Sequence, residues 1–292
     1  MNWWRDFADH VEPDAPLGRL TWFRLGGKAR YLYRPREVGE LSRFMERARA
    51  ENLPVKVLGA GANVLIRDDG FDGVVVRLDQ EAFRRIKRED SRVAAGAGVD
   101  LMNLSRRCSE QGLAGLEGLA GIPASVGGAI RMNAGGRSGE IGDVVSSVTV
   151  LSPEGEVEEW LRDRVGFAYR HTDIGEEVVL GAKLQLRADN PSLVRRRYDE
   201  LFACKQKSQP LADKSAGCIF KNPPGQSAGA LIDRAGLKGK NCGAARVSER
   251  HANFIVAYKG ATASDVLRLI DLVRDRVRLA FATELEVEID IW

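Results

Sequence analysis

Histidine and cysteine are scarce in this chain of 292 residues, and their scarcity limits the metal chemistry that it can carry. The three histidines lie far apart in the sequence, and the four cysteines, at positions 108, 204, 218 and 242, form no CxxC pair. Zinc sites usually depend on closely spaced ligands of these two types. We therefore expect no metal centre, and we expect the cysteines to be reduced in a cytosolic protein.

The chain also lacks any long hydrophobic run. No stretch reaches the roughly 18 consecutive apolar residues that indicate a membrane-spanning helix. The N-terminal sequence MNWWRDFADH has no basic segment followed by an apolar run, so no signal peptide is predicted. A net charge of +3 is too small to indicate a nucleic-acid partner by itself. We expect a cytoplasmic monomer that binds a small molecule, with neither a membrane nor a nucleic acid as partner.

The pattern of apolar residues predicts helices alternating with many strands, an α+β fold. Helices are expected at 38–51, at 100–111 with Asp100 as N-cap, at 193–206, and at 263–280 with Ser264 as N-cap. Strands are expected at 53–58, 71–78, 92–98, 144–152, 156–161, 178–186, 252–257 and 284–291. Asn190–Pro191 marks the expected boundary, which gives an arm at 1–20, a large domain at 21–190 and a smaller α+β domain at 191–292.

Two glycine-rich segments are the strongest local signals. The first, Gly59–Leu65, follows an expected strand, and its backbone N–H groups could form a nest for an anion. It leads into more strand rather than into a helix, so it is not a dinucleotide-binding fingerprint, and taken alone it indicates only a turn. In the second segment, eight of the residues from 112 to 136 are glycine and almost none is charged. Such a segment should form neither an ordinary helix nor an ordinary strand. A tightly turning backbone around a large planar ligand explains it better than a close-packed turn region does.

These segments belong to a series of motifs that resembles the UDP-N-acetylenolpyruvoylglucosamine reductase family over nearly the whole chain, in the family's order. The motifs are TWFRLGGKA (21–29), LGAGANVLIRDDGFDGVVV (58–76), GLEGLAGIPASVGGAIRMNAG (115–135), FAYRHT (167–172), QPLADKSAGCIFKNP (209–223), AGALIDRAGLKGK (228–240), VSERHANFIV (247–256) and LEVEI (285–289).

The resemblance implies a two-lobed FAD-binding domain of the vanillyl-alcohol-oxidase-like type at 21–190 and a substrate-binding domain at 191–292. It also implies NADPH-dependent, FAD-mediated reduction of UDP-N-acetylglucosamine enolpyruvate to UDP-N-acetylmuramate, a step of peptidoglycan precursor synthesis. The chain between Tyr169–Arg170 and the strand expected at 178 is too short for the extra substrate-covering loop of one subclass. The sequence therefore resembles the shorter type.

The resemblance further implies three catalytic residues. Arg170 matches the family's arginine, whose fixed charge and planar donors suit the substrate carboxylate. Glu288 matches a glutamate that acts with this arginine to stabilise the enolate. Cys218 stands where the family usually has a serine that protonates the enolate carbon, and a thiol also carries a transferable proton. Because Glu286 and Glu288 share one face of the expected strand, periodicity alone cannot separate their roles.

Binding residues also follow from the resemblance. Lysine complements a diphosphate, and asparagine can hydrogen-bond to phosphate or base, so the substrate contacts are expected from Tyr169, Lys221, Asn222 and Lys238. Non-covalent FAD is expected to contact Arg24, Gly59, Ala60, Gly61, Ala62, Asn63, Val64, Leu65, Gly121, Ile122, Pro123, Gly127, Gly128, Ala129, Asn133 and Ala134.

Two other readings stay open at this level. An FAD-dependent alcohol or sugar-lactone oxidase of the same fold would share the glycine loops but would not need the three catalytic residues. A non-catalytic protein that binds a nucleotide or nucleic acid through the C-terminal lysines would contain no flavin and would show salt-sensitive binding. The sequence lacks the interleaved basic and aromatic residues that such a surface usually carries.

Overall fold

The computed structural model describes residues 3–292, and its chain divides into two units by contact density. The first unit comprises the residues up to Asp14 together with Arg30–Ala60 and Asp72–Cys204. The second comprises Ala15–Ala29, Gly61–Phe71 and Lys205–Trp292. Each unit has its own hydrophobic core. No helix of the described part is long and apolar enough to cross a membrane.

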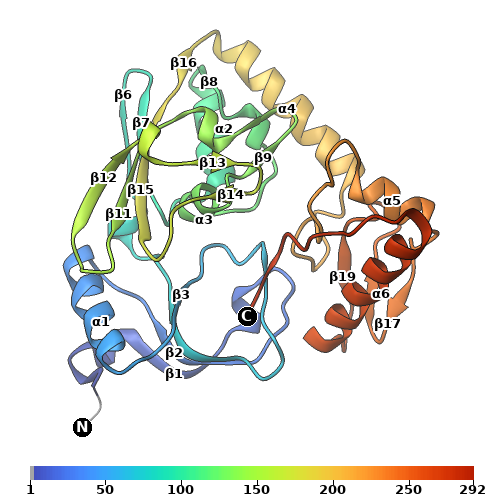
Figure 1. Ribbon diagram of the computed structural model, residues 1–292. Helices are drawn as coiled ribbons and strands as arrows, with labels where there is room; N and C mark the ends of the chain where they lie inside the picture. The colour runs from blue at the N-terminus through green and yellow to red at the C-terminus, as the bar shows by residue number, and fades with distance from the viewer. Residues whose placement is uncertain (1–2) are drawn as a thin grey trace. The chain divides into compact units, whose positions relative to one another are not determined.

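A four-stranded sheet and one helix form the first layer of the first unit (Figure 1). Its strand order is β1-β2-β5-β3, with bounds Val11–Pro16, Lys28–Tyr33, Phe71–Val76 and Val55–Val57. Helix α1 (Val38–Ala50) turns its apolar face to this sheet, where Phe44 stacks on Tyr33 at 3.7 Å between ring centroids. The predicted helix at 38–51 is thus confirmed. The N-terminal residues supply the short 3-10 helix η1 (Arg5–His10) and the edge strand β1.

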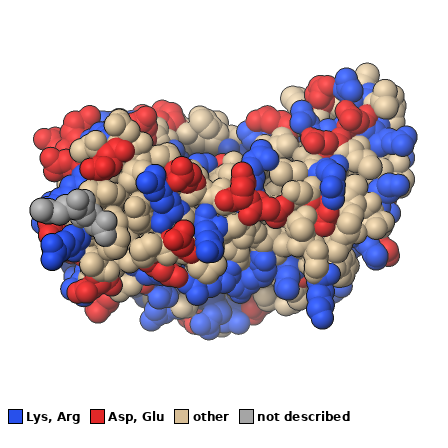
Figure 2. All heavy atoms as spheres, turned by 90° about the horizontal axis from the view of Figure 1, so that it is seen from below, with Lys and Arg blue, Asp and Glu red and all other residues tan. Residues whose placement is uncertain are grey.

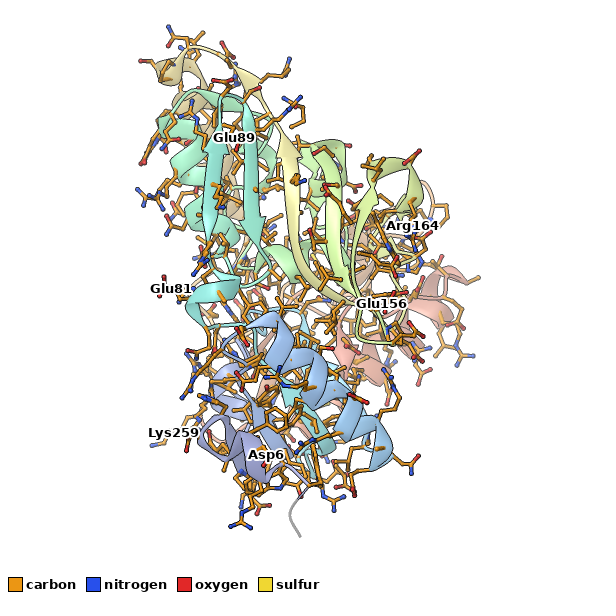
Figure 3. The ribbon with its side chains drawn as sticks, turned by 90° about the vertical axis from the view of Figure 1, so that its left-hand side faces the viewer. Asp6, Glu81, Glu89, Glu156, Arg164 and Lys259 are labelled. Carbon is orange, nitrogen blue, oxygen red and sulfur yellow. The ribbon has the colours of Figure 1, made fainter. Side chains whose placement is uncertain are left out.

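A five-stranded antiparallel sheet carries most of the rest of the first unit. Its order is β12-β11-β15-β7-β6, with bounds Val157–Leu161, Val145–Leu151, Val178–Gln185, Arg92–Gly96 and Ile86–Glu89. Figure 3 shows Glu156 and Arg164 beyond opposite ends of the edge strand β12, where the Arg164 guanidinium covers the Trp160 ring. The strands predicted near 92, 144, 156 and 178 are confirmed. Their apolar side chains either alternate with polar ones, as in a half-buried strand, or follow one another directly, as in a buried strand.

Two helices pack against the sheets of the first unit. Helix α2 (Leu101–Glu110) begins as predicted, with the Asp100 carboxylate accepting from the backbone N–H of Asn103 at 2.7 Å. Helix α3 (Val126–Arg131) lies inside the glycine-rich segment, where the sequence predicted no helix. That prediction was wrong because the Ser125 hydroxyl caps the turn, accepting from the N–H of Gly128 at 3.2 Å. A Cβ at Gly127 would come 2.9 Å from that of Ala97, so glycine lets this helix pack closely.

Short two-stranded pairings complete the first unit. They join β8 (Leu113–Ala114) to β16 (Arg187–Ala188), β9 (Gly135–Gly136) to β10 (Gly139–Glu140), and β13 (Phe167–Ala168) to β14 (His171–Thr172). The single-turn 3-10 helices η3 (Glu81–Phe83), η4 (Glu117–Leu119), η5 (Ile141–Asp143) and η6 (Arg162–Arg164) connect these elements. The turn of the β13–β14 hairpin holds two of the predicted site residues, Tyr169 and Arg170.

The second unit packs helices on a small antiparallel sheet. The sheet has the order β17-β18-β19, with bounds Asn241–Cys242, Ala245–Val247 and Ile255–Ala257. Helix α5 (Ala228–Arg234) and the long helix α6 (Ala263–Phe281) share its core. The 3-10 helix η2 (Gly18–Leu20) also belongs to this unit, and helix α4 (Pro191–Ser208) begins in the first unit and ends in the second.

Two expectations for the second unit are corrected. Thr262, not Ser264, is the N-cap of α6, because Thr262 and Asp265 exchange reciprocal hydrogen bonds of 3.1 Å in a capping box. The strand expected at 284–291 is reduced to β20 (Asp290–Ile291), which pairs in parallel with β4 (Val64–Leu65). Upstream of it, Val287 forms an isolated bridge with Phe220.

Charge does not segregate on the face shown in Figure 2, where Lys and Arg side chains mix with Asp and Glu. A mixed surface of this kind produces no extended field of one sign. This distribution agrees with the small net charge of +3.

Candidate active site

The two glycine-rich segments meet within the first unit. A Cβ built on Gly59 would lie 2.4 Å from the Ser125 hydroxyl oxygen and 3.9 Å from the Cα of Gly128. Since real Cβ contacts are essentially never as short as the first of these, only glycine allows the loop after β3 to pass so close to the start of α3. The structure thus brings Gly59 and Gly128, which were predicted from separate motifs, to one place.

In the second segment, most backbone N–H groups are hydrogen-bonded to acceptors of the chain. The N–H groups of Val126 and Gly127 donate to Val99 and Ala97 at 2.9 Å each, and the N–H of Ile122 donates to Leu119 at 3.1 Å. Gly121 has a φ of +75°, which glycine adopts readily and other residues rarely do. This region, which also contains Pro123 and the buried Ala129, is therefore a fixed wall rather than a flexible loop.

The first segment, by contrast, leaves backbone donors available. Within residues 3–292, the N–H groups of Gly59 and Ala60 in the first unit, and of Ala62 in the second, donate to no protein acceptor. Ordered N–H groups without a partner in the chain can hydrogen-bond to an anionic group such as a diphosphate. The glycine-lined wall and the donors of Gly59 and Ala60, all within the first unit, fit the FAD expected from the sequence.

Asn133 is a structural link between the second segment and the next hairpin. Its side-chain amide donates to the Glu140 carboxylate at 2.6 Å and to the Ala168 carbonyl at 3.0 Å, and its Oδ1 accepts from the N–H of Gly142 at 3.1 Å. These bonds engage the whole amide of a residue that is 2% exposed. Asn133, which the resemblance lists with the cofactor residues, therefore fixes the β13–β14 hairpin through its side chain, and neighbouring Ala134 is half-buried.

Tyr169 and Arg170 occupy the two-residue turn of that hairpin. Arg170 has a φ of +54°, a left-handed conformation that costs a non-glycine residue roughly 1–3 kcal/mol and often occurs at functional sites. The Arg170 guanidinium lies 5.0 Å from the centroid of the Tyr169 ring, and its Nη1 atom is shielded from solvent. Tyr169 itself is 43% exposed. The turn thus presents an aromatic face and a fixed cation together.

In the second unit, the rest of the first glycine segment lies against residues 20–22. The N–H of Trp22 donates to the Gly61 carbonyl at 2.9 Å, and a Cβ at Gly61 would lie 2.3 Å from the Leu20 carbonyl oxygen. Val64 and Leu65 then form β4 and pair with β20. The close approach and the φ of +68° at Gly61 both require glycine.

Cys218, Glu288 and Asn63 come together in the second unit. The N–H of Glu288 donates to the Ile219 carbonyl at 2.8 Å, so the two chain segments run side by side. The Asn63 amide donates to the Glu288 carbonyl at 3.2 Å, and the N–H of Asp290 donates to the Asn63 carbonyl at 2.9 Å. The predicted cofactor residue Asn63 therefore contacts Glu288 directly, and Glu288 in turn contacts Ile219, the residue after Cys218. Space is open beside Gly217, next to the half-buried Cys218.

The structure gives Glu286 and Glu288 different surroundings, a distinction that periodicity alone could not make. The Glu286 side chain is 71% exposed, and its carboxylate forms an ion pair with Lys221 at 2.7 Å. Glu288 is half-buried beside Ile219. Glu286 therefore orients the predicted substrate residue Lys221, and the N–H of Lys221 also donates to the Glu286 carbonyl at 2.8 Å. Sequence reasoning gave Glu286 no such part.

The other predicted substrate residues flank helix α5. The Asn222 side-chain oxygen accepts from the N–H of Ala228 at 3.0 Å, which ties Asn222 to the first residue of the helix. Lys238 lies beyond the other end of the helix and forms an ion pair with Asp233 at 2.8 Å. Both side chains are thus held by defined contacts rather than extended into solvent.

Arg24 lines a hollow of about 230 Å³ in the second unit. Arg24 is exposed, has a φ of +58°, and donates to the Arg19 carbonyl. Sequence reasoning singled out Arg24 alone, although Trp22 belongs to the same motif. The hollow is lined by Trp22, Arg24, Ala212, Asp213 and Lys214.

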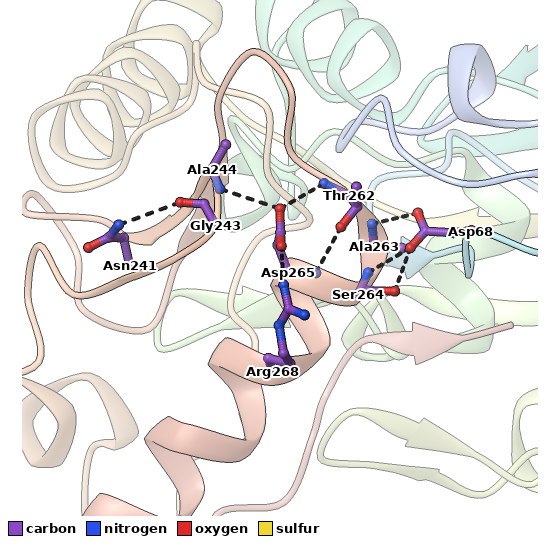
Figure 4. Close-up of polar contacts among 9 residues, drawn as sticks. All are labelled: Asp68, Asn241, Gly243, Ala244, Thr262, Ala263, Ser264, Asp265 and Arg268. Atoms are coloured by element: carbon purple, nitrogen blue, oxygen red, sulfur yellow. Dashed lines mark hydrogen bonds and ion pairs between the residues drawn. The ribbon is translucent and has the colours of Figure 1, made fainter.

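A cluster of hydrogen bonds at the start of α6 attaches segment 61–71 to the C-terminal region (Figure 4). The Asp68 carboxylate accepts from the N–H of Ala263 at 2.8 Å and from the N–H and hydroxyl of Ser264 at 2.9 and 2.6 Å. Partial burial is the largest single effect on the pKa of Asp68 and raises it, but these three bonds together lower the pKa below its ordinary value. On the other side of the helix end, the Asp265 carboxylate accepts from the N–H of Ala244 at 3.3 Å.

The catalytic residues expected from the sequence fall in both units. Arg170 belongs to the first unit, and Cys218 and Glu288 belong to the second. Within the second unit the structure places Cys218 and Glu288 on neighbouring segments, as an active site requires. That all three residues gather at one site stays a prediction.

Comparison with known proteins places this arrangement in one family. Residues 209–292 match the profile of the C-terminal domain of UDP-N-acetylenolpyruvoylglucosamine reductase, and residues 29–160 match an FAD-binding domain profile. The chain is 41% identical to the UDP-N-acetylenolpyruvoylglucosamine reductase of Heliobacterium modesticaldum, over 98% of this chain and 92% of the relative.

Solved structures agree with these matches. The UDP-N-acetylenolpyruvylglucosamine reductase of Thermus caldophilus is similar with a TM-score of 0.84 and 40% identity, covering 97% of this chain and 98% of its own. The glucose dehydrogenase Phl p 4.0202 is similar with a TM-score of 0.52 and 16% identity, covering 65% of this chain and 45% of its own. At that identity the second likeness shows the fold alone. The α+β fold with a vanillyl-alcohol-oxidase-like FAD-binding domain is thereby confirmed.

Proposed function

This chain belongs to the UDP-N-acetylenolpyruvoylglucosamine reductase family, and we propose that it reduces UDP-N-acetylglucosamine enolpyruvate to UDP-N-acetylmuramate with NADPH as reductant. The observation that carries the proposal is that Asn63 hydrogen-bonds to Glu288 in the second unit, and that the N–H of Glu288 donates to Ile219, the neighbour of Cys218. It links the predicted cofactor loop to the segments that carry Cys218 and Glu288, whose side chains can donate or accept a proton. The substrate is a small UDP-sugar, and the enzyme acts as a cytoplasmic monomer.

The glycine-lined segments would hold FAD. Gly59 and Ala60 offer backbone donors to an anionic group, and the region from Gly121 to Ala129, which is hydrogen-bonded to Ala97 and Val99, supplies a wall that does not need to reorganise. When bound, FAD supplies the hydride-transfer chemistry, accepting reducing equivalents from NADPH. The chain's own residues bind the substrate, orient it and manage the charge and the proton.

Arg170 stabilises the negative charge that develops when the enolpyruvyl double bond is reduced. The charge spreads from the carbon next to the new C–H bond into the carboxylate, so a fixed cation at the carboxylate favours the transition state. A guanidinium meets a carboxylate with two parallel donors. The left-handed backbone at Arg170 and the Asn133 bonds hold the turn in place, so little reorganisation is needed.

Cys218 supplies the proton to the enolate carbon, and Glu288 assists in stabilising the enolate. The thiol is more acidic than the serine hydroxyl usual in the family, and it keeps a proton at a similar reach. Gly217 leaves open space next to this thiol. The hydrogen bond between the Glu288 N–H and the Ile219 carbonyl fixes the carboxyl-bearing segment beside it.

The diphosphate is bound by the lysines of the second unit. Lys221 is oriented by Glu286, and Lys238 by Asp233. An anionic diphosphate competes for both ammonium groups with exposed carboxylates, whose surface ion pairs contribute little energy on their own. Asn222, fixed at the start of α5, contributes a polar contact to the same moiety.

Anaerobic stopped-flow spectroscopy tests the proposal. NADPH should bleach the flavin absorbance, and UDP-N-acetylglucosamine enolpyruvate should restore it in a second step. If NADPH bleaches the flavin but the enolpyruvyl substrate does not restore the colour, the proposed substrate is wrong. If the protein purifies without flavin and does not bind added FAD, the whole proposal is wrong.

Cys218 variants test the proton-donor role. We expect Cys218→Ala to be bleached by NADPH at the normal rate but to stall in the second half-reaction, whereas Cys218→Ser should retain turnover because a hydroxyl can also donate a proton. The matched control is Cys242→Ala, a half-buried cysteine of the same unit outside the proposed site, which should behave as the parent enzyme. Normal turnover by Cys218→Ala would refute the role.

A further inference from the structure

The imidazole of His251 is held in a tightly hydrogen-bonded loop between β18 and β19. The N–H of Ser248 donates to the Phe254 carbonyl at 2.8 Å, and the N–H of Phe254 donates to the His251 carbonyl at 3.0 Å. The Ser248 hydroxyl accepts from the N–H of His251 at 3.4 Å. The ring also packs edge-on against the Phe254 ring, with 4.9 Å between centroids. The loop therefore fixes where the imidazole lies.

One nitrogen of this ring has no partner elsewhere in the chain. The Nδ1 atom of His251 is buried, and no other residue within 3–292 forms a hydrogen bond with it. A buried polar atom left in this state costs roughly 1–3 kcal/mol, and a native protein rarely keeps that cost without a reason. His251 as a residue is only half-buried, so a small turn of the ring brings this nitrogen to a ligand that approaches the loop. A ligand group that hydrogen-bonds to Nδ1 would remove the cost.

The surroundings of the ring indicate which ligand this is. The Asn253 side chain brackets Phe220, accepting from its N–H at 2.9 Å and donating to its carbonyl at 2.8 Å. This bracket fastens the His251 loop to the segment that leads into Lys221 and Asn222. On the other side, a Cβ at Gly229 in the first turn of α5 would lie 3.4 Å from the His251 Cε1 atom. The ring thus adjoins the residues proposed to bind the uridine diphosphate.

The charge state of the ring suits a neutral hydrogen-bonding role. Burial lowers the pKa of His251 below its ordinary value, and the nearby Lys238 ammonium lowers it further. The imidazole is then neutral near pH 7, with one nitrogen as donor and the other as acceptor. A neutral ring adds a directional contact to the site without adding to the charge that Lys221 and Lys238 already provide.

We propose that Nδ1 of His251 hydrogen-bonds to the uridine diphosphate moiety of the substrate and is a further specificity-determining residue of the enzyme. The inference rests on the proposed function, since the ligand is the nucleotide part of the proposed substrate. It accounts for the buried nitrogen, the rigid loop and the adjacency to Asn222 and Lys238. Product UDP-N-acetylmuramate and free UDP carry the same moiety and should use the same contact.

Imidazole NMR on the parent holoenzyme tests the contact directly. The chain has three histidines, so histidine-selective ¹⁵N labelling gives three imidazoles, which His10→Gln and His171→Gln variants would assign. On titration with UDP, the Nδ1 resonance of His251 should shift and that of His10 should not. If UDP binds, as calorimetry would report, and the His251 resonances stay in place, the proposal is overturned. This measurement does not depend on any His251 variant folding.

Variants of His251 test its contribution to affinity. We expect His251→Leu to weaken UDP binding by about tenfold and to raise KM for the enolpyruvyl substrate similarly, the loss expected for one good hydrogen bond. The kcat and the rate of flavin bleaching by NADPH should not change. His251→Asn, whose amide can reach a position similar to that of Nδ1, should recover most of the affinity. The matched control His10→Leu, in the first unit, should bind UDP normally.

The outcomes separate this inference from the proposed function. If the parent enzyme reduces the enolpyruvyl substrate and His251→Leu has an unchanged KM and an unchanged affinity for UDP, the His251 contact alone is wrong. If the parent enzyme never reduces that substrate, the proposed function is wrong, whatever the His251 variants do. A purely structural role for His251 would lower thermal stability and leave the affinity of the remaining folded protein for UDP intact, which would also overturn the inference.

Discussion

Asp68→Asn should loosen the attachment of segment 61–71 to α6. The substitution keeps the size of the side chain but removes the charge and one acceptor, so the three hydrogen bonds that Asp68 accepts from Ala263 and Ser264 weaken together. Losing a capping side chain costs about 0.5–2 kcal/mol, and losing an acidic group at a helix N-terminus costs about 0.3–1 kcal/mol. Because Asp68 is exposed to solvent, we expect a combined loss near the lower end, about 1–1.5 kcal/mol.

The effect should depend on pH in a defined direction. The pKa of Asp68 in the folded protein is lowered from its ordinary value, so the stabilisation is complete above about pH 4 and is lost as the pH falls through the folded pKa. The stability difference between the parent and Asp68→Asn should therefore be constant from pH 7 to about 5 and should narrow below about pH 4.

Thermal denaturation of the flavin-loaded protein between pH 7 and 3 is the assay. A loss of about 1–1.5 kcal/mol corresponds to roughly 4–6 °C in Tm for a unit of this size. Asp69→Asn is the matched control, because it makes the same charge change at the next residue, which is also exposed. Equal Tm values for the parent and Asp68→Asn at pH 7, or a difference that widens as the pH falls, would refute the reasoning.

Three further substitutions test local requirements in the two units. Gly61→Ala forces a Cβ to 2.3 Å from a backbone oxygen at a φ of +68°, whereas Gly217→Ala meets no atom within 4 Å at a φ of +76°. Both substitutions introduce backbone strain of about 1–3 kcal/mol. Because only Gly61→Ala adds a steric clash, this variant should unfold at a clearly lower denaturant concentration and release flavin more readily. Equal denaturation midpoints for the two variants would contradict this expectation. Asn133→Ala leaves the N–H of Gly142 and the carbonyl of Ala168 without partners, so it should cost about 2 kcal/mol. It should also speed hydrogen exchange at Arg170, and an unchanged exchange rate would rule out the positioning role.

The helices with clear amphipathic periods could be predicted from the sequence to within a few residues. The helix expected at 38–51 is found at Val38–Ala50, and that expected at 263–280 is found at Ala263–Phe281. The N-cap of the second helix is harder to choose, because Thr262 and Ser264 are both good capping residues. The partner three residues later decides between them, since Thr262 has the acidic Asp265 at that position and so completes a capping box.

The helix within the glycine-rich segment could not be predicted by propensity. Each glycine costs a helix up to about 1 kcal/mol relative to alanine, so Gly127 and Gly128 argue against one locally. The compensation is tertiary, because Gly127 packs against Ala97 and Gly128 lies beside Gly59, contacts that no local window contains. The glycines that make the helix unpredictable from the sequence also allow the two glycine-rich segments to pack closely in the fold.

The candidate site shows the same limit. Alternation places Glu286 and Glu288 on one face of a strand, and only the pairing of Val287 with Phe220 gives the two carboxylates different neighbours. That pairing places the Glu286 carboxylate at Lys221 and the Glu288 backbone at Ile219. The motifs singled out Glu288 alone, and only the contact between distant segments shows that Glu286 pairs with Lys221.

The discontinuity of the two units has a consequence for the first glycine segment. The chain passes from the first unit to the second between Ala60 and Gly61, inside the segment expected to contact FAD. Gly59 is required by a contact within the first unit, and Gly61 by a contact within the second. A single short loop therefore carries two independent steric requirements. Substitutions at Gly59 and Gly61, which share no contact, should lower stability additively, whereas strong coupling between them would mean that the loop responds as one element.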